Sequence, residues 1–205
     1  MDIIELVIDE NEELSGIEAI SVVSAPAIEE NFLALKNEEQ IRLAEVSKEK
    51  RILMGAALIP DRPIYRKNGE QEFYIFFSKD TVVKASQMYL KAGNQGQATM
   101  EHTEEKLEGM TVVESWIIED SVHDKSRKYG LDLPLGTWMV SMKIDNDDIW
   151  DNYVKQNKIV GFSIEGYFAD RLNNKVKENK TDQLTEEDKL LKNIIDVLQE
   201  SNTNA

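Results

Sequence analysis

The sequence contains no cysteine. This absence excludes disulfide bonds, thiol nucleophiles and metal sites built from thiolates. Histidine is scarce as well, with His102 and His123 as its two occurrences, so a structural zinc site has too few ligands. No apolar run approaches the roughly 20 residues that a membrane-spanning helix requires. We therefore expect a protein that needs no metal or other cofactor and does not enter a membrane.

Basic residues are outnumbered in this chain of 205 residues. Its 39 Asp and Glu against 24 Lys and Arg give a formal net charge of −15. Such a surface repels phosphate backbones, so we expect no nucleic-acid partner, and it would attract basic segments of another protein. Residues 1–6 are acidic and alternate in polarity, unlike a signal peptide. We expect a soluble, intracellular protein.

Short segments that are apolar or alternate in polarity dominate the chain, and this pattern is typical of strands. They lie at residues 3–8, 17–23, 51–59, 72–77, 98–102, 111–118, 137–144 and 159–168. Helices are expected after Ser78 and at residues 145–157. The Asn68-Gly69 turn predicts a long hairpin between 51–59 and 72–77. Because strands and helices do not alternate regularly, the sequence favours an α+β, mainly β fold with an antiparallel, barrel-like sheet and helices packed around it.

The composition changes after Asp170. Residues 171–183 are polar and nearly without apolar side chains, which indicates a linker. Residues 184–200 carry an apolar stripe at helical spacing. We therefore expect one domain at residues 1–170, a polar linker, and an amphipathic C-terminal helix that docks on its own domain or on a partner.

The segment Ile159–Phe168 alternates as a half-buried strand does, and it places Ser163 and Glu165 on the same side. Gly161 and Gly166 flank this pair. Glycine inside a strand indicates a bulge, or the close approach of another backbone or a ligand. A serine held on such a strand is a candidate nucleophile. The alternative is a surface Ser and a surface Glu on an ordinary sheet edge.

A serine hydroxyl needs a base within hydrogen-bond reach, and that base benefits from a third group that orients it. His102 is the candidate base for Ser163, because it ends a short strand just before an acidic loop. His123 lies in a charged loop and is expected to be solvated. Two carboxylates remain open for the third position. Glu114 interrupts an apolar strand face, which is costly unless the carboxylate is paired; Glu165 shares a face with the nucleophile.

One acidic segment deserves comparison with a calcium loop. Asp145-Asn146-Asp147-Asp148 begins like such a loop, but its sixth position is Trp150 where the loop needs Gly, and its twelfth is Gln156 where the loop needs Glu. Acidic residues at the start of a helix explain the segment better. The sequence also lacks a Gly-rich phosphate loop. We expect no metal site.

Four stretches together resemble a known family: residues 19–28, Met100-Glu101-His102, Val113-Glu114-Ser115-Trp116 and Gly161–Gly166, with Pro134–Met139 also similar. In their order and spacing they are similar to the XkdF-like serine proteases of tailed bacteriophages, which are grouped with the prohead maturation proteases. The resemblance covers about residues 1–170.

This resemblance implies a herpesvirus-protease-like fold, a closed β-barrel with surrounding helices. It implies a serine endopeptidase that cleaves scaffold protein, or scaffold-like capsid segments, inside the prohead in the host cytoplasm. The family's histidine falls on His102 and its serine on Ser163, while Glu114 and Glu165 both remain candidates for the third residue. The expected partners are the scaffold and major capsid proteins, and a second copy of the chain. Backbone N–H groups in the Gly136 loop or near Gly161 are candidates for the oxyanion site.

Two other functions remain open. The chain could be a non-enzymatic head component that keeps the barrel and associates with the scaffold. It could also be a serine hydrolase that acts on small esters. The sequence favours the protease over the non-enzymatic component, because a His, a Ser and a semi-buried Glu are all present where the chemistry needs them.

Overall fold

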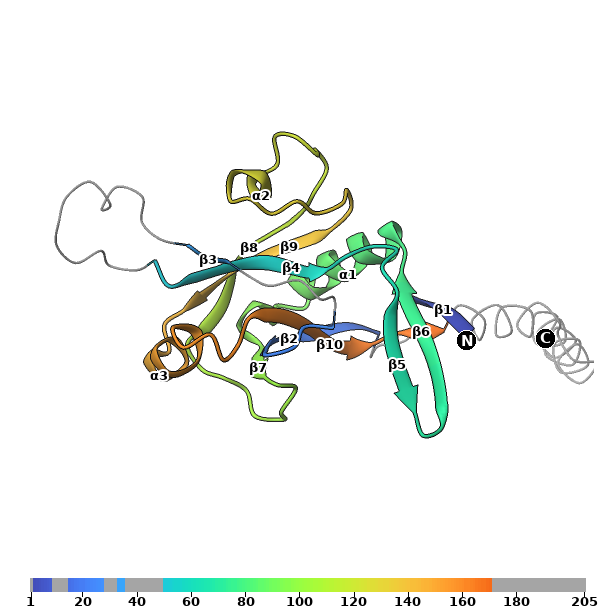
Figure 1. Ribbon diagram of the computed structural model, residues 1–205, viewed down its shortest axis with the longest axis horizontal. Helices are drawn as coiled ribbons and strands as arrows, with labels where there is room; N and C mark the ends of the chain where they lie inside the picture. The colour runs from blue at the N-terminus through green and yellow to red at the C-terminus, as the bar shows by residue number, and fades with distance from the viewer. Residues whose placement is uncertain (1, 9–14, 28–32, 36–49, 171–205) are drawn as a thin grey trace, which may run out of the picture. The chain divides into compact units, whose positions relative to one another are not determined.

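A computed structural model describes residues 2–8, 15–27, 33–35 and 50–170 (Figure 1). They belong to a compact unit that spans Met1–Ala169, with Asp170 just beyond it. The predicted linker at 171–183 and the predicted helix at 184–200 lie outside the described residues. Among the helices that are described, none is long and apolar enough to cross a membrane.

The strands in the described part of the chain form three sheets. The first has the order β11 (Ala169–Asp170), β1 (Asp2–Val7), β6 (Gln71–Phe77) and β5 (Ile64–Asn68). The second has the order β10 (Gly161–Tyr167), β2 (Gly16–Val23) and β7 (Ala98–Met100). The third has the order β3 (Leu33–Leu35), β4 (Ile52–Leu58), β9 (Trp138–Ile144) and β8 (Met110–Ile117).

The helical elements are short, apart from one. They are α1 (Lys79–Lys91), a 3₁₀ turn at Asn94–Gly96, α2 (Lys125–Lys128), α3 (Asp147–Ile149) and a π-helical turn at Trp150–Val154. Helix α1 begins after Ser78 and buries residues at helical spacing, among them Val82, Ala85 and Tyr89. The Tyr89 ring meets the Trp138 ring of β9 edge to face, with 5.5 Å between centroids. This contact fixes α1 against the third sheet (Figure 1).

The chain is mainly β, but the prediction of a closed antiparallel β-barrel is wrong. In the described residues the three sheets are open, and each ends in strands that have a neighbour on one side only. Two strand pairs, β1 with β6 and β2 with β7, are parallel. The physical reason is that alternation in a sequence fixes which face of a strand is buried and leaves its partner and direction undetermined.

The predicted hairpin between 51–59 and 72–77 is also wrong, although its turn is placed correctly. Gly69 has a positive φ of 61°, as such a turn requires. The strand before the turn is β5, and Asn68 stands opposite Gln71 across it. Strand β4, in contrast, pairs with β3 and β9. Strand β5 was not predicted from the sequence because it contains the polar residues Arg66 and Lys67. An exposed hairpin strand has few of the apolar residues by which strands are recognised.

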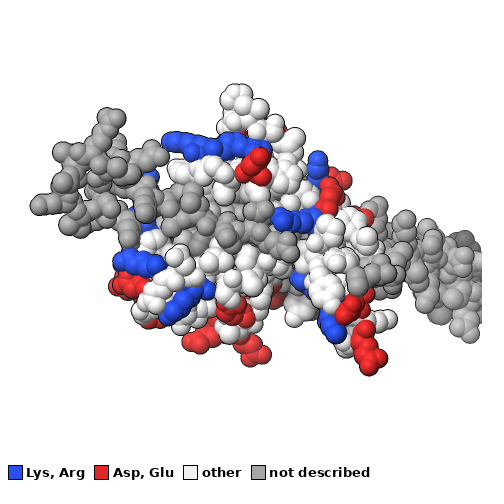
Figure 2. Space-filling model, in the orientation of Figure 1, with Lys and Arg blue, Asp and Glu red and all other residues white. Residues whose placement is uncertain are grey.

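Strand β4 and strand β9 form the centre of the core, since most of their residues are buried. On the second sheet, Ile20, Val22 and Phe162 also belong to the core. The intervening residues of the same strands therefore point to the opposite face. On the surface, Figure 2 shows Lys and Arg interspersed with Asp and Glu over the face in view.

Candidate active site

A row of three hydroxyl groups crosses the second sheet. Ser163 of β10 stands opposite Ser21 of β2, and Ser21 stands opposite Thr99 of β7. Residues directly opposite one another in neighbouring strands point to the same face, so the three side chains share one face of the sheet. They are nearly buried, with exposed fractions of 7% for Ser163, 0% for Ser21 and 4% for Thr99.

His102 reaches this face through an unusual backbone. Glu101 and His102 follow β7 directly and have φ angles of 51° and 58°, in the left-handed region that residues other than glycine seldom adopt. Two hydrogen bonds hold the turn: the His102 N–H donates to Ser21 Oγ at 3.1 Å, and the Ser24 N–H donates to Glu101 Oε1 at 2.7 Å. Strained backbone of this kind concentrates at functional sites, where surrounding contacts maintain it.

The His102 ring lies beside Glu165. Its Nδ1 is 3.3 Å from Glu165 Oε1, and the same carboxylate oxygen accepts a hydrogen bond from Thr99 Oγ1. The histidine side chain is 46% exposed and that of Glu165 is 27% exposed, so both are open to a substrate. A proton on Nδ1 that faces the carboxylate leaves the lone pair on Nε2, the nitrogen that a general base uses.

Ser163 and His102 are not in direct contact. Within the described part of the chain, no hydrogen bond joins Ser163 Oγ to the His102 ring. They are connected through Ser21, which faces Ser163 across the strands and accepts the His102 N–H. Catalytic hydrogen bonds are often long in a protein without substrate and tighten when substrate binds.

Glu114 lies in β8, in the third sheet, and has other partners. Its Oε2 accepts hydrogen bonds from Lys125 Nζ and, at 2.5 Å, from Ser141 Oγ. These bonds, Lys125 first, hold the pKa of Glu114 below its usual value. Lys125 also lies over the Trp116 ring, 5.4 Å from its centroid. A carboxylate on an apolar strand face is costly unless it is paired. The partner of Glu114 is Lys125, and no histidine is needed to explain its position.

His123 lies apart from these residues and is 83% exposed. Its Nδ1 is 3.1 Å from Asp120 Oδ2, and Asp120 also accepts hydrogen bonds from the N–H groups of His123 and Val122. These bonds, the His123 N–H first, lower the pKa of Asp120 to about 2. The contacts fix a loop at the surface.

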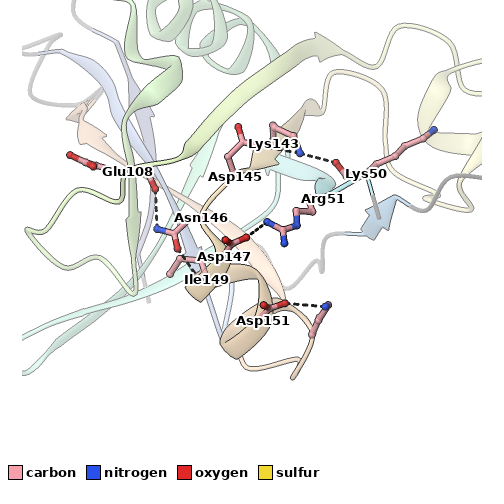
Figure 3. Close-up of polar contacts among 10 residues, drawn as sticks. Lys50, Arg51, Glu108, Lys143, Asp145, Asn146, Asp147, Ile149 and Asp151 are labelled. Atoms are coloured by element: carbon pink, nitrogen blue, oxygen red, sulfur yellow. Dashed lines mark hydrogen bonds and ion pairs between the residues drawn. The ribbon is translucent and has the colours of Figure 1, made fainter. Parts of the chain in front are cut away.

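The acidic segment at Asp145–Asp148 is occupied by protein groups (Figure 3). Arg51 pairs with Asp147, and Lys143 Nζ lies 3.2 Å from Asp145. Asn146 Oδ1 caps the helix by accepting the Ile149 N–H at 3.1 Å. Among the described residues there is no group of three or more His, Asp or Glu side chains that could hold a metal ion.

The Gly136 loop and the backbone near Gly161 were the predicted oxyanion positions. The Gly136 N–H donates to the Ile118 carbonyl at 2.8 Å and is therefore already used. On β2, the backbone groups of Ile20 and Val22 bond toward β7, so those of Ser21 point toward β10 and pair with Ser163. The next N–H along β10, that of Ile164, consequently points to the edge of the sheet where no described strand pairs with β10. It can donate to an oxygen placed beside Ser163.

The structure explains why a glycine stands at position 166, next to Glu165. The register of β10 and β2 shifts between Glu165 and Gly166, which is a β-bulge. A Cβ on Gly166 would overlap the carbonyl oxygen of Gly16. The glycine thus permits the close approach of another backbone, one of the two reasons expected from the sequence. The extra residue of the bulge is Glu18 of β2, which the register of the two strands skips.

A cavity of about 190 Å³ adjoins Ser163. It lies where the three sheets meet, and its walls come from all of them: Leu6, Ala27, Ala57, Leu58, Ile64, Arg66, Ile75, Phe77, Ser163, Ile164, Gly166 and Phe168. Most of these side chains are apolar.

Sequence reasoning missed two residues of this site, Ser21 and Thr99. Ser21 carried a usable signal, since it is a lone polar residue within the apolar run Ile20–Val23. Thr99 carried none, because threonine is common in strands.

Comparison with known proteins identifies a family. Residues 39–173 match the family described as "Putative phage serine protease XkdF", and this range includes Ser163, His102, Glu114 and Glu165. No curated protein and no solved structure matches the chain. The match covers more than half of the sequence and confirms the resemblance noted above. The chain therefore belongs to the XkdF family of phage serine proteases.

Proposed function

We propose that this chain is a serine endopeptidase in which Ser163 is the nucleophile, His102 the general base and Glu165 the residue that orients the base. The observation that carries the proposal is the 3.3 Å approach of His102 Nδ1 to Glu165 Oε1, on the sheet face that also carries Ser163. Glu114 is the weaker candidate for the third position, because Lys125 and Ser141 already occupy its carboxylate.

The reaction follows from these positions. With Nδ1 directed at Glu165, His102 Nε2 accepts the Ser163 proton as Oγ attacks the scissile carbonyl. The Ile164 N–H, at that edge of β10, donates to the oxyanion that forms. Protonated His102 then gives its proton to the leaving amine, and water hydrolyses the acyl-enzyme. Substrate binding must close the gap between Ser163 Oγ and the ring.

The proposed substrates are scaffold protein or scaffold-like capsid segments inside the assembling prohead, in the host cytoplasm. The family assignment to phage serine proteases supports this setting. The net charge of −15 suits a substrate with basic segments.

The test is co-expression of the chain with the neighbouring phage head genes, followed by intact mass measurement of the products. Ser163→Ala and His102→Ala should each abolish processing. His123→Ala, the matched histidine control, should leave the products unchanged. If the Ser163→Ala and His102→Ala proteins gave the same products as the parent, the protease assignment would fail.

One observation favours a second function, a non-enzymatic head component. Ser163 is 7% exposed, and in the described residues its hydroxyl is not bonded to the His102 ring. On this alternative the three hydroxyls have a structural role. Incorporation into heads by the Ser163→Ala protein, with normal head assembly and no processed product from either protein, would support it.

A further inference from the structure

The cavity beside Ser163 has the dimensions of a side-chain pocket. Its volume is about 190 Å³. For comparison, an apolar protein cavity of roughly 150 Å³, lined by Leu, Ile and Phe, is large enough to bind benzene. The cavity beside Ser163 can therefore hold the side chain of Leu, Met or Phe. A lysine or arginine of the substrate would lose hydration there, and the wall residues that the structure describes offer it no carboxylate.

Arg66 introduces one charged group into this apolar wall. In the described part of the chain its side chain makes one hydrogen bond, from Nη1 to the Tyr65 carbonyl at 3.0 Å, and no ion pair. Its neighbour Lys67, by comparison, lies 3.6 Å from Glu72. An arginine without a carboxylate partner among the described residues is notable in a chain with 15 more acidic than basic residues. Its guanidinium can bind a carboxylate through two parallel hydrogen bonds.

We infer that this cavity selects the substrate: it receives a Leu, Met or Phe side chain close to the scissile bond, while Arg66 binds an acidic residue next to that side chain. The inference rests on the proposed function, because Ser163 forms part of the same wall. A side chain held in this cavity fixes the neighbouring peptide carbonyl against the nucleophile. Binding energy from such a group lowers the barrier by orienting the reacting atoms.

Peptidyl diphenyl phosphonates test the inference, since they label an activated serine and carry a chosen side chain. We expect the reagent with Leu at the phosphonate position to label Ser163 at least about tenfold faster than those with Ala or Lys. With Leu kept, Glu at a neighbouring position should label about fivefold faster than Gln. Labelling is read by intact mass, with Ser163→Ala as the blank.

Three variants probe the walls. Ala27→Phe should fill the cavity and reverse the preference toward Ala, whereas Leu6→Ala should enlarge it and shift the preference toward Phe. Arg66→Gln should remove the advantage of Glu, and the matched control Lys67→Gln should keep it. Circular dichroism melts confirm that each variant folds, and the two cavity variants act in opposite directions, so one suffices if the other unfolds.

The outcomes separate the two proposals. If no phosphonate labels Ser163, the proposed function fails and the inference fails with it. If Ser163 is labelled but Leu and Lys reagents react equally, or neither cavity variant changes the preference, the cavity assignment is overturned and the protease stands. If Arg66→Gln leaves the Glu advantage intact, the role of Arg66 is overturned.

Discussion

The sequence left two candidates for the third residue, Glu114 first and Glu165 as its rival, and their surroundings differ in the structure. We expect Glu165→Gln to lower the rate of processing by about 10²- to 10⁴-fold, since the base loses the carboxylate that orients it and stabilises its charged form. Glu114→Gln should keep the rate within about threefold of the parent, as its contacts lie around Lys125. The measurement is kcat/KM on a cleaved peptide. Equal losses in the two variants would contradict the assignment of Glu165.

Glu114 should instead contribute to stability, in a pH-dependent way. Its pKa is lower in the folded protein than its ordinary value of 4.5, because Lys125 and Ser141 bond to the charged form. The contribution is therefore fully present above about pH 5 and is lost as the pH falls through the folded pKa. The side chain is 46% exposed, so we expect less than about 1 kcal/mol.

Urea unfolding at pH 7 and pH 3 measures this contribution. The stability difference between the parent and Glu114→Gln should be present at pH 7 and shrink at pH 3. A difference that stays constant over this range would show that the carboxylate charge is not what stabilises the fold at this position.

The sequence identified Ser163 and His102 as candidates, because chemistry restricts the residue types and a strand restricts the faces, and it left Glu114 and Glu165 open for the third position. It could not choose Glu165 over Glu114. That choice depends on two features that no periodicity encodes: the left-handed turn that brings His102 back over β2, and the loop that delivers Lys125 to Glu114.

At the scale of elements, the bulge of β2 opposite Glu165 and Gly166 depends on a glycine. Gly166→Ala should destabilise the fold by about 1–3 kcal/mol, because its Cβ would overlap the Gly16 carbonyl oxygen and backbone cannot move aside cheaply. Gly96→Ala is the control, since an added Cβ meets nothing within 4 Å there. Chemical denaturation of both variants gives the comparison. Equal stabilities would mean that the two backbones are not held as close as the structure places them.

Strands were easier to predict than their pairing. The segments at β2, β8, β9 and β10 were found from alternation, and the turn at Asn68-Gly69 was correctly placed. The closed barrel and the long hairpin failed because pairing depends on tertiary contacts. Parallel pairs such as β2 with β7 join segments that are far apart in the sequence, and nothing local marks them.

At the scale of the whole molecule, the core belongs to one compact unit. The buried apolar residues in the described part of that unit include Ile8, Trp138 and Phe162. A chain that ends at residue 170 should therefore unfold cooperatively, with a melting temperature within a few degrees of the parent. A circular dichroism melt decides this. Loss of the transition would show that the last 35 residues, 171–205, are needed for folding.

The same truncation addresses the predicted amphipathic helix at 184–200. We propose that it docks on scaffold or on a second copy of the chain, because an apolar stripe in an acidic segment needs a covering surface. Sedimentation and incorporation into heads should both decrease on truncation. Unchanged values for both would refute the docking role.

The cavity at the junction of three sheets has a thermodynamic consequence. A ligand that touches all three sheets binds the folded chain and has no site on the unfolded one, so it must raise the melting temperature by mass action. At a concentration of 100 times its Kd, the gain is about 2.7 kcal/mol. A thermal-shift screen of head-protein peptides against the Ser163→Ala protein would therefore rank the proposed substrates by affinity without any turnover.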